Sequence, residues 1–188
     1  MLVRRYLFQL QDAVEALWHR VYNVRHEGGK GAMTPAYQES TTVYALGRVL
    51  AAERILTLEG VYPQLKRHYP ELGETLQARR LSVELRFADF QQYDRIALAE
   101  AVLEQDERGF RPSTHLAFQD RYVEGASGEA SWLERARTAV GGLGEDPRSM
   151  EDWLDLLGMI AHLTSAATGI PTSIAEKEQS LQAQLGSS

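Results

Sequence analysis

The sequence contains no cysteine among its 188 residues. This absence excludes disulfide bonds, thiolate metal sites and cysteine nucleophiles, and it favours a reducing, cytoplasmic location. The chain also lacks an uncharged apolar run of about 18 residues, the length that a membrane-spanning helix requires. Its formal net charge is −6, which disfavours nucleic acid as a partner.

Sequence motifs for catalysis and cofactor binding are missing as well. The glycine-rich residues 28–31 lack the spacing of a phosphate-binding P-loop, and a glycine stands where that loop needs Ser or Thr after its lysine. None of the five histidines follows a glutamate by three residues, so the Glu-x-x-His pattern of di-iron bundles is absent. H-E-x-x-H and G-x-S-x-G patterns are absent too. We therefore expect no metal, no cofactor and no catalytic residue.

The clearest positive signal is a helical stripe near the start of the chain. Apolar residues recur at spacings of three and four residues, namely Leu7, Leu10, Val14, Leu17, Val21 and Val24. This periodicity is typical of an amphipathic helix with a narrow apolar face, close to that of a coiled coil. Two interpretations stay open: the stripe packs into the core of its own chain, or it pairs with a second copy.

Further helices follow along the chain. Pro35 begins a helix that we expect to run to Leu58, with a break near Ser40, and Gly60 ends it. Other helices are expected over residues 62–69, 91–104, 118–123, 131–140 and 147–168. These patterns predict an all-α, or nearly all-α, single-domain bundle of about five to seven helices over residues 4–168. Residues 169–188 are expected to form a C-terminal helix or a disordered tail.

One segment is ambiguous between helix and strand. Leu81, Val83, Leu85 and Phe87 alternate as the residues of a half-buried strand do. The residue types around them favour a helix, which we prefer. In the strand interpretation, residues 82–87 pair with residues 115–118 in a short two-stranded sheet.

Residues 40–60 form a strongly apolar helix that carries the charges of Arg48, Glu53 and Arg54. Charges in such a setting need partners, and Arg95 and Glu100 on another apolar helix are the natural candidates. Two interpretations stay open: these groups are ion pairs that fix helix packing, or they line a pocket for an anionic ligand. The candidate ligand-binding residues are Tyr44, Arg48, Glu53, Arg54, Arg95, Glu100 and His115.

Four segments resemble stretches of uncharacterised bacterial and fungal helical proteins, in the same order. They are residues 41–56 (TTVYALGRVLAAERIL), 95–101 (RIALAEA), 115–120 (HLAFQD) and 153–157 (WLDLL). Such proteins often carry one membrane-spanning helix ahead of the segment that matches Arg4. The resemblance implies a helical architecture and a membrane-proximal location, but no activity. We expect membrane attachment only if an anchor precedes this chain.

Three hypotheses of function follow. The leading one is a non-catalytic interaction or scaffold domain that self-associates through Leu7, Leu10, Val14, Leu17 and Val21. The second is a small-molecule or enzymatic pocket for an anionic ligand on the helix over residues 40–60. The third is a domain at the cytoplasmic face of a membrane, whose mildly basic N-terminus faces lipid headgroups.

Overall fold

A computed structural model describes residues 2–27, 35–85, 90–107, 109–125 and 131–177 of the 188-residue chain. The helices are α1 (Leu2–Glu27), α2 (Pro35–Leu58), α3 (Tyr62–His68), α4 (Pro70–Ala78), α5 (Leu81–Glu84), α6 (Gln92–Val102), α7 (His115–Gly125), α8 (Ser131–Gly141) and α9 (Pro147–Thr168), with a 3₁₀ turn η1 (Gly142–Glu145). The strands are β1 (Leu103–Asp106) and β2 (Gly109–Pro112). The predicted class, nearly all-α with one short β pairing, is confirmed.

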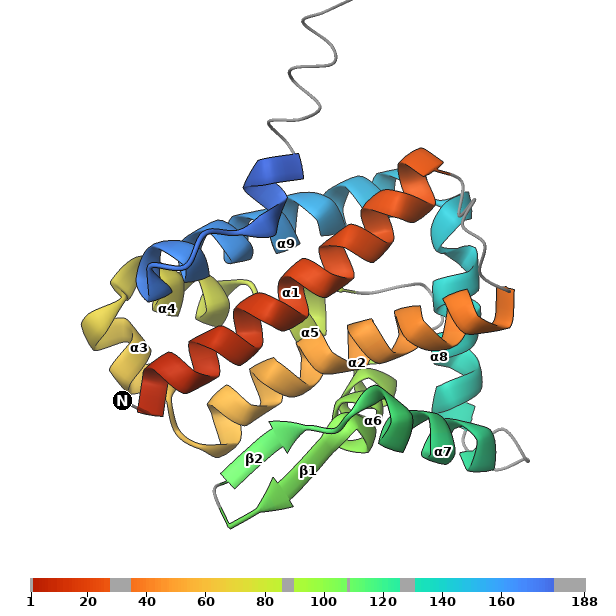
Figure 1. The fold of residues 1–188 in the computed structure, drawn as a ribbon, viewed down its shortest axis with the longest axis horizontal. Helices are drawn as coiled ribbons and strands as arrows, with labels where there is room; N and C mark the ends of the chain where they lie inside the picture. Colours follow the sequence, from red (N-terminus) through yellow and green to blue (C-terminus); the bar gives the residue numbers. More distant parts are fainter. Residues whose placement is uncertain (1, 28–34, 86–89, 108, 126–130, 178–188) are drawn as a thin grey trace, which may run out of the picture.

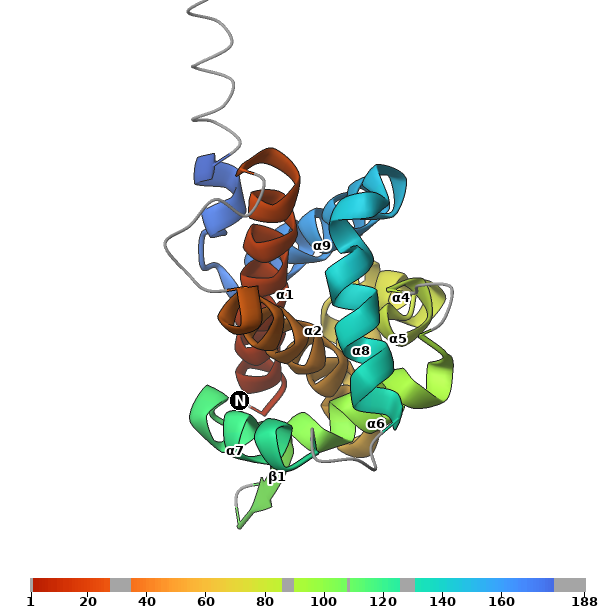
Figure 2. The ribbon, with the colours of Figure 1, turned by 90° about the vertical axis from the view of Figure 1, so that its right-hand side faces the viewer.

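The long helices form layers around α2. Figure 1 shows α1 lying between α9 and α2, and α1 contacts both of them. On its other sides α2 contacts α6, α7, α8 and β2, and Figure 2 shows α8 running across the end of the α1–α2 layer. Helix α2 is therefore the central helix of the domain, as its apolar composition predicts.

The apolar stripe of α1 is part of the core of a single chain. Its members Leu7, Leu10, Val14, Leu17 and Val21 all have 0% exposure. Of the two interpretations of this stripe, the structure bears out packing within one chain, against α9 and α2. Self-association stays a prediction, but an interface between copies would have to use residues other than these five.

Helix α2 has the predicted bounds and no break at Ser40. The hydroxyl of Thr41 donates to the carbonyl of Tyr37 at 2.7 Å, and that of Thr42 donates to the carbonyl of Gln38 at 2.7 Å. Hydroxyls that bond back to the preceding turn let Ser and Thr residues stay within a helix. The chain leaves the helix through Gly60, whose φ of +60° favours glycine.

The β pairing differs from the predicted alternative. Strands β1 and β2 form an antiparallel hairpin with Leu103 opposite Pro112, which begins at the end of the helix expected over residues 91–104. Gly109 permits the reversal because its φ is +105°. Residues 81–84 are helical, as preferred, and residues 115–118 lie in α7. Residues 86 and 87 of the ambiguous segment lie outside the described residues.

The chain beyond α9 folds back onto α1. Gly169, with a φ of +74°, ends α9, and the Gln11 side chain then donates to the carbonyl of Ile170 at 3.2 Å. Glu15 accepts hydrogen bonds from the backbone and hydroxyl of Ser173, and Ile174 has 0% exposure. Residues 173–177 are helical, and Ile174 among them belongs to the core. None of the described helices has the long, nearly uncharged apolar stretch that crossing a membrane requires.

Candidate functional site

The seven candidate residues do not form one site. Glu53, Arg54 and Arg95 line a cleft between α2, α5 and α6, which we call the α2–α6 cleft. Glu100 does not line this cleft but is ion-paired with Arg54. Tyr44 and Arg48 line a groove on another side of α2, which we call the α1–α2 groove.

The α2–α6 cleft encloses about 90 Å³, room for a few water molecules or one small group. Its lining residues are Leu50, Glu53, Arg54, Thr57, Tyr62, Arg80, Ser82, Gln92, Arg95, Ile96 and Ala99. Tyr62, Arg80 and Ser82 were not among the sequence candidates. Tyr62 begins α3, Arg80 directly precedes α5 and Ser82 lies in α5. No motif in the sequence predicts that these short helices lie beside the cleft.

Glu53 holds the start of α5. Its side chain is buried, one carboxylate oxygen accepts the backbone N–H of Leu81 at 2.7 Å, and the other accepts that of Ser82 at 2.8 Å. A carboxylate at a helix N-terminus satisfies N–H groups that the helix itself leaves unpaired. Both oxygens of Glu53 are therefore engaged within the protein.

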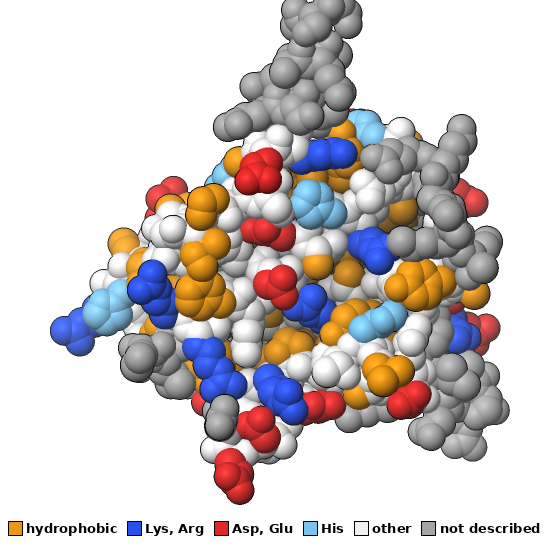
Figure 3. Space-filling view, viewed as in Figure 1, with side chains coloured by type: hydrophobic (Ala, Val, Ile, Leu, Met, Phe, Trp, Pro, Cys, Tyr) orange, Lys and Arg blue, Asp and Glu red, His pale blue; other side chains and the backbone are white. Residues whose placement is uncertain are grey.

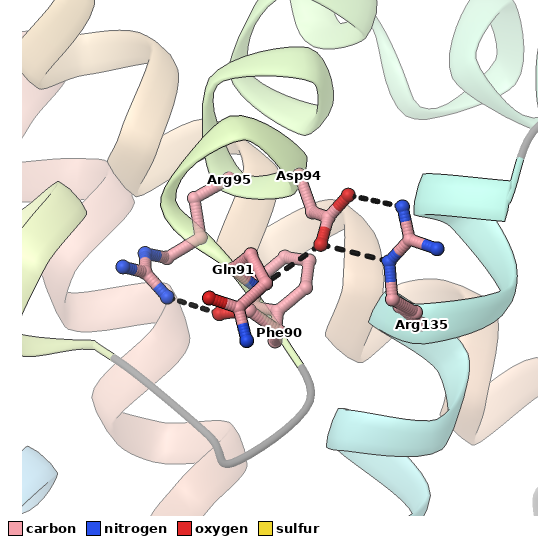
Figure 4. Close-up of polar contacts among 5 residues, drawn as sticks. All are labelled: Phe90, Gln91, Asp94, Arg95 and Arg135. Atoms are coloured by element: carbon pink, nitrogen blue, oxygen red, sulfur yellow. Dashed lines mark hydrogen bonds and ion pairs between the residues drawn. The ribbon is translucent and has the colours of Figure 1, made fainter.

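Arg95 holds the same segment by donating to carbonyl groups, whereas Glu53 accepts N–H groups. Its Nε donates to the carbonyl of Ser82 at 2.6 Å, and its Nη1 donates to the carbonyl of Phe90. Figure 4 shows the guanidinium of Arg95 on one side of the first turn of α6 and the carboxylate of Asp94 on the other. Glu53 and Arg95 thus bind the N–H and the C=O of Ser82 and hold α5 between α2 and α6.

Asp94 joins α6 to α8. Its carboxylate accepts two hydrogen bonds from Arg135, at 2.8 Å from Nε and 2.5 Å from Nη2, and one from the backbone of Gln91 at 3.0 Å. The hydrogen bonds from Arg135 hold the pKa of Asp94 below its usual value. This bidentate pair is a structural contact, because Asp94 does not line the cleft.

We expect Asp94→Asn to make the free energy of unfolding less dependent on pH in the acidic range. A lowered folded-state pKa means that the carboxylate stabilises the fold above its unfolded pKa of about 4, and that this stabilisation disappears as pH falls through the folded pKa. The variant should lose about 1 kcal/mol at pH 7, since Arg135 is partly screened by solvent. Between about pH 5 and pH 3 its unfolding free energy should fall less than that of the wild type. Urea denaturation across this range measures the difference, and parallel pH curves would contradict it.

Arg54 keeps a free donor in the cleft. Its Nη2 forms an ion pair at 3.3 Å with Glu100, which the sequence offered as a partner for the charges of α2 without specifying which one. The Arg54 and Glu100 side chains are 37% and 55% exposed, and ion pairs with this exposure contribute little to stability. The Nε of Arg54 is buried and has no hydrogen-bond partner. Arg54 can therefore serve a ligand without giving up its contact to Glu100.

Tyr62 adds a second donor. Burial, and after it the charge of Glu53, raises the pKa of Tyr62 to about 12, so its hydroxyl stays protonated at neutral pH. Three arginines face one carboxylate among the lining residues, and that carboxylate is engaged with backbone N–H groups. The cleft is thus rich in donors and positive charge, which suits an anion.

The α1–α2 groove has a different character. Arg48 is ion-paired with Asp12 of α1, a partner that the sequence did not suggest, and its guanidinium lies 5.8 Å from the centre of the Tyr44 ring. The groove has a volume of about 350 Å³. Its lining residues are Phe8, Gln9, Asp12, Tyr44, Arg48, Pro112 and Ser113.

His115 lies behind Tyr44 and lines neither site. The two ring centres are 4.9 Å apart. Burial, and after it the charge of Arg20, lowers the pKa of His115, so the ring is neutral at neutral pH. We assign it to the packing between α2 and α7.

In the part of the chain that the structure describes, no three side chains of the metal-ligating types Asp, Glu, His or Cys gather in one place. Comparison with known proteins adds no analogue, because no protein family, curated protein or solved structure matches this chain.

Proposed function

We propose that this chain is a non-catalytic binding domain that holds a small anion in the α2–α6 cleft. The observation that carries the proposal is the buried Nε of Arg54, which has no partner within a cleft lined by two further arginines. Leaving a buried charged donor unpaired is unfavourable, and an anionic acceptor would relieve this.

The surroundings of Arg54 support an oxyanion in particular. Guanidinium groups bind phosphate and carboxylate through paired N–H donors, and Arg80 and the Tyr62 hydroxyl supply further donors. A cavity of about 90 Å³ limits the enclosed part of the ligand to a phosphate, sulfate or carboxylate group. We infer binding rather than catalysis because Glu53 is the one carboxylate among the lining residues described, and both of its oxygens are already engaged.

The hypothesis of a self-associating scaffold has weaker support. The five α1 residues on which it was based are fully buried within one chain. A cytoplasmic location remains our proposal, resting on the absence of cysteine. The membrane-apposed alternative rests only on the resemblance and on the basic residues at the start of α1.

Titration with inorganic phosphate tests the anion site. At neutral pH and low salt we expect calorimetry to detect binding with a Kd of about 0.1–1 mM. Arg54→Gln should weaken binding at least about ten-fold, because it removes the charge and the free Nε donor. The variant should fold normally, since its ion pair with Glu100 is exposed.

Arg111→Gln is the matched control. Arg111 lies on β2 outside the cleft and is ion-paired with Glu104 and Asp106, so it shares the exposure and pairing of Arg54 but not its position. We expect this variant to bind phosphate as the wild type does. No binding by the wild type at about 20 mM phosphate, or equal losses in both variants, would overturn the proposal.

A further inference from the structure

Two residues that line the α1–α2 groove each have a buried polar atom without a hydrogen-bond partner. These atoms are the carbonyl oxygen Oε1 of Gln9 on α1 and the hydroxyl Oγ of Ser113, which directly follows β2. Ser113 is only 2% exposed. Unpaired buried polar groups are few in folded proteins, so two of them on residues that line one groove mark a candidate binding site.

The backbone of Ser113 is held firmly in place. Its N–H donates to the carbonyl of Val102 at 2.6 Å, and its carbonyl accepts the hydroxyl of Tyr44 at 2.6 Å. Both backbone groups are thus engaged, and the side-chain hydroxyl alone remains available. A donor fixed in this way is preorganised for a ligand.

The side chains that line the groove carry no net charge. Phe8, which is 37% exposed, Tyr44 and Pro112 offer apolar or aromatic surface. Arg48 and Asp12 neutralise one another. On the face that carries α1 and α2, Figure 3 shows red and blue side chains next to one another beside hydrophobic ones. A planar, uncharged ligand fits these walls better than an ion does.

We propose that the α1–α2 groove binds a planar, uncharged ring that carries an amide group. The amide N–H of the ligand donates to Oε1 of Gln9, the amide carbonyl accepts the hydroxyl of Ser113, and the ring packs on Phe8 and Tyr44. This site does not depend on the anion site, because the two pockets share no lining residue.

Benzamide is the probe for this site. In a ¹H–¹⁵N NMR titration of the full chain we expect saturable shifts at Gln9 and Ser113 with a Kd of about 1–10 mM, as small aromatic ligands give. Benzoate, which lacks the N–H donor, and N,N-dimethylbenzamide, which lacks it without gaining charge, should bind at least about five-fold more weakly. Equal binding of all three compounds, or no saturable shift with benzamide, would overturn the proposal.

Ser113→Ala separates ligand binding from folding. Removing an unpaired buried hydroxyl should leave the melting temperature unchanged or raised, while benzamide binding weakens about five-fold. Ser82→Ala, in the α2–α6 cleft, is the control and should bind benzamide as the wild type does. Unchanged binding in Ser113→Ala would show that the ligand does not pair with the Ser113 hydroxyl and would contradict the proposal, whatever the result of the phosphate titration.

Discussion

Replacing Glu53 with alanine is expected to lower the free energy of unfolding by about 3 kcal/mol, one of the two largest effects that the structure predicts. The change leaves the backbone N–H groups of Leu81 and Ser82 without acceptors, and Leu81 lies in the core with 0% exposure. It also leaves a cavity under α5. For a chain of this length the melting temperature should fall by roughly 6–12 °C, which thermal or urea denaturation measures.

Two further variants show whether the loss comes from the buried hydrogen bonds of Glu53. Glu53→Gln keeps the size of the side chain but has one amide oxygen to offer to two N–H groups, so it should fall between the wild type and Glu53→Ala. Glu100→Ala removes the exposed carboxylate that pairs with Arg54 and should change stability by less than about 0.5 kcal/mol. Similar losses in Glu53→Ala and Glu100→Ala would contradict the role that we assign to Glu53.

Gly73→Ala is expected to destabilise the fold by about 2–3 kcal/mol. A Cβ atom at Gly73, which is buried in α4, would lie 2.8 Å from the backbone nitrogen of Lys66 and 3.0 Å from the carbonyl carbon of Leu65. These are backbone atoms of α3, so no side chain can rotate to relieve the clash. Chemical denaturation of the variant measures the loss.

Gly141→Ala is the matched control, because an added Cβ atom at this position has no close neighbours. Gly141 ends α8 in a helical conformation, with φ −62° and ψ −39°, and a Cβ atom there meets nothing within 4 Å. We expect a gain of about 0.5–1 kcal/mol, because alanine restricts the unfolded chain more than glycine does. A change of stability in the same direction in both glycine variants would contradict the close approach of α3 and α4 at Gly73.

The long helices could be predicted because local chemistry marks their ends. The Asp146 side chain accepts the backbone N–H of Ser149 at 3.1 Å at the start of α9, and Gly169 ends that helix, in agreement with the helix expected over residues 147–168. The β1–β2 hairpin could not be predicted in the same way. Its sequence has no apolar alternation, and its position follows from Ser113 bonding back to Val102 at the end of α6.

The candidate site was only partly predictable. Glu100 could be named as a partner for the charges of α2 because these charges and Glu100 all interrupt apolar helices, which suggests contact between the helices. Arg48 and Arg54 are six residues apart, which on a helix is a rotation of about 120°, so helix geometry alone separates them into two sites. The Asp12 partner of Arg48 could not be predicted, because it depends on how α1 and α2 pack together.

The central claim is that Arg54 presents a free donor to an anion in the α2–α6 cleft. The most direct test follows the arginine Nε–Hε resonances of the ¹⁵N-labelled protein during a titration with inorganic phosphate up to about 20 mM. We predict a saturable shift of the Arg54 resonance, accompanied by Arg80, while the Arg111 resonance changes only as it does with added chloride. An Arg54 resonance that does not shift, or that shifts no more than that of Arg111, would contradict the account.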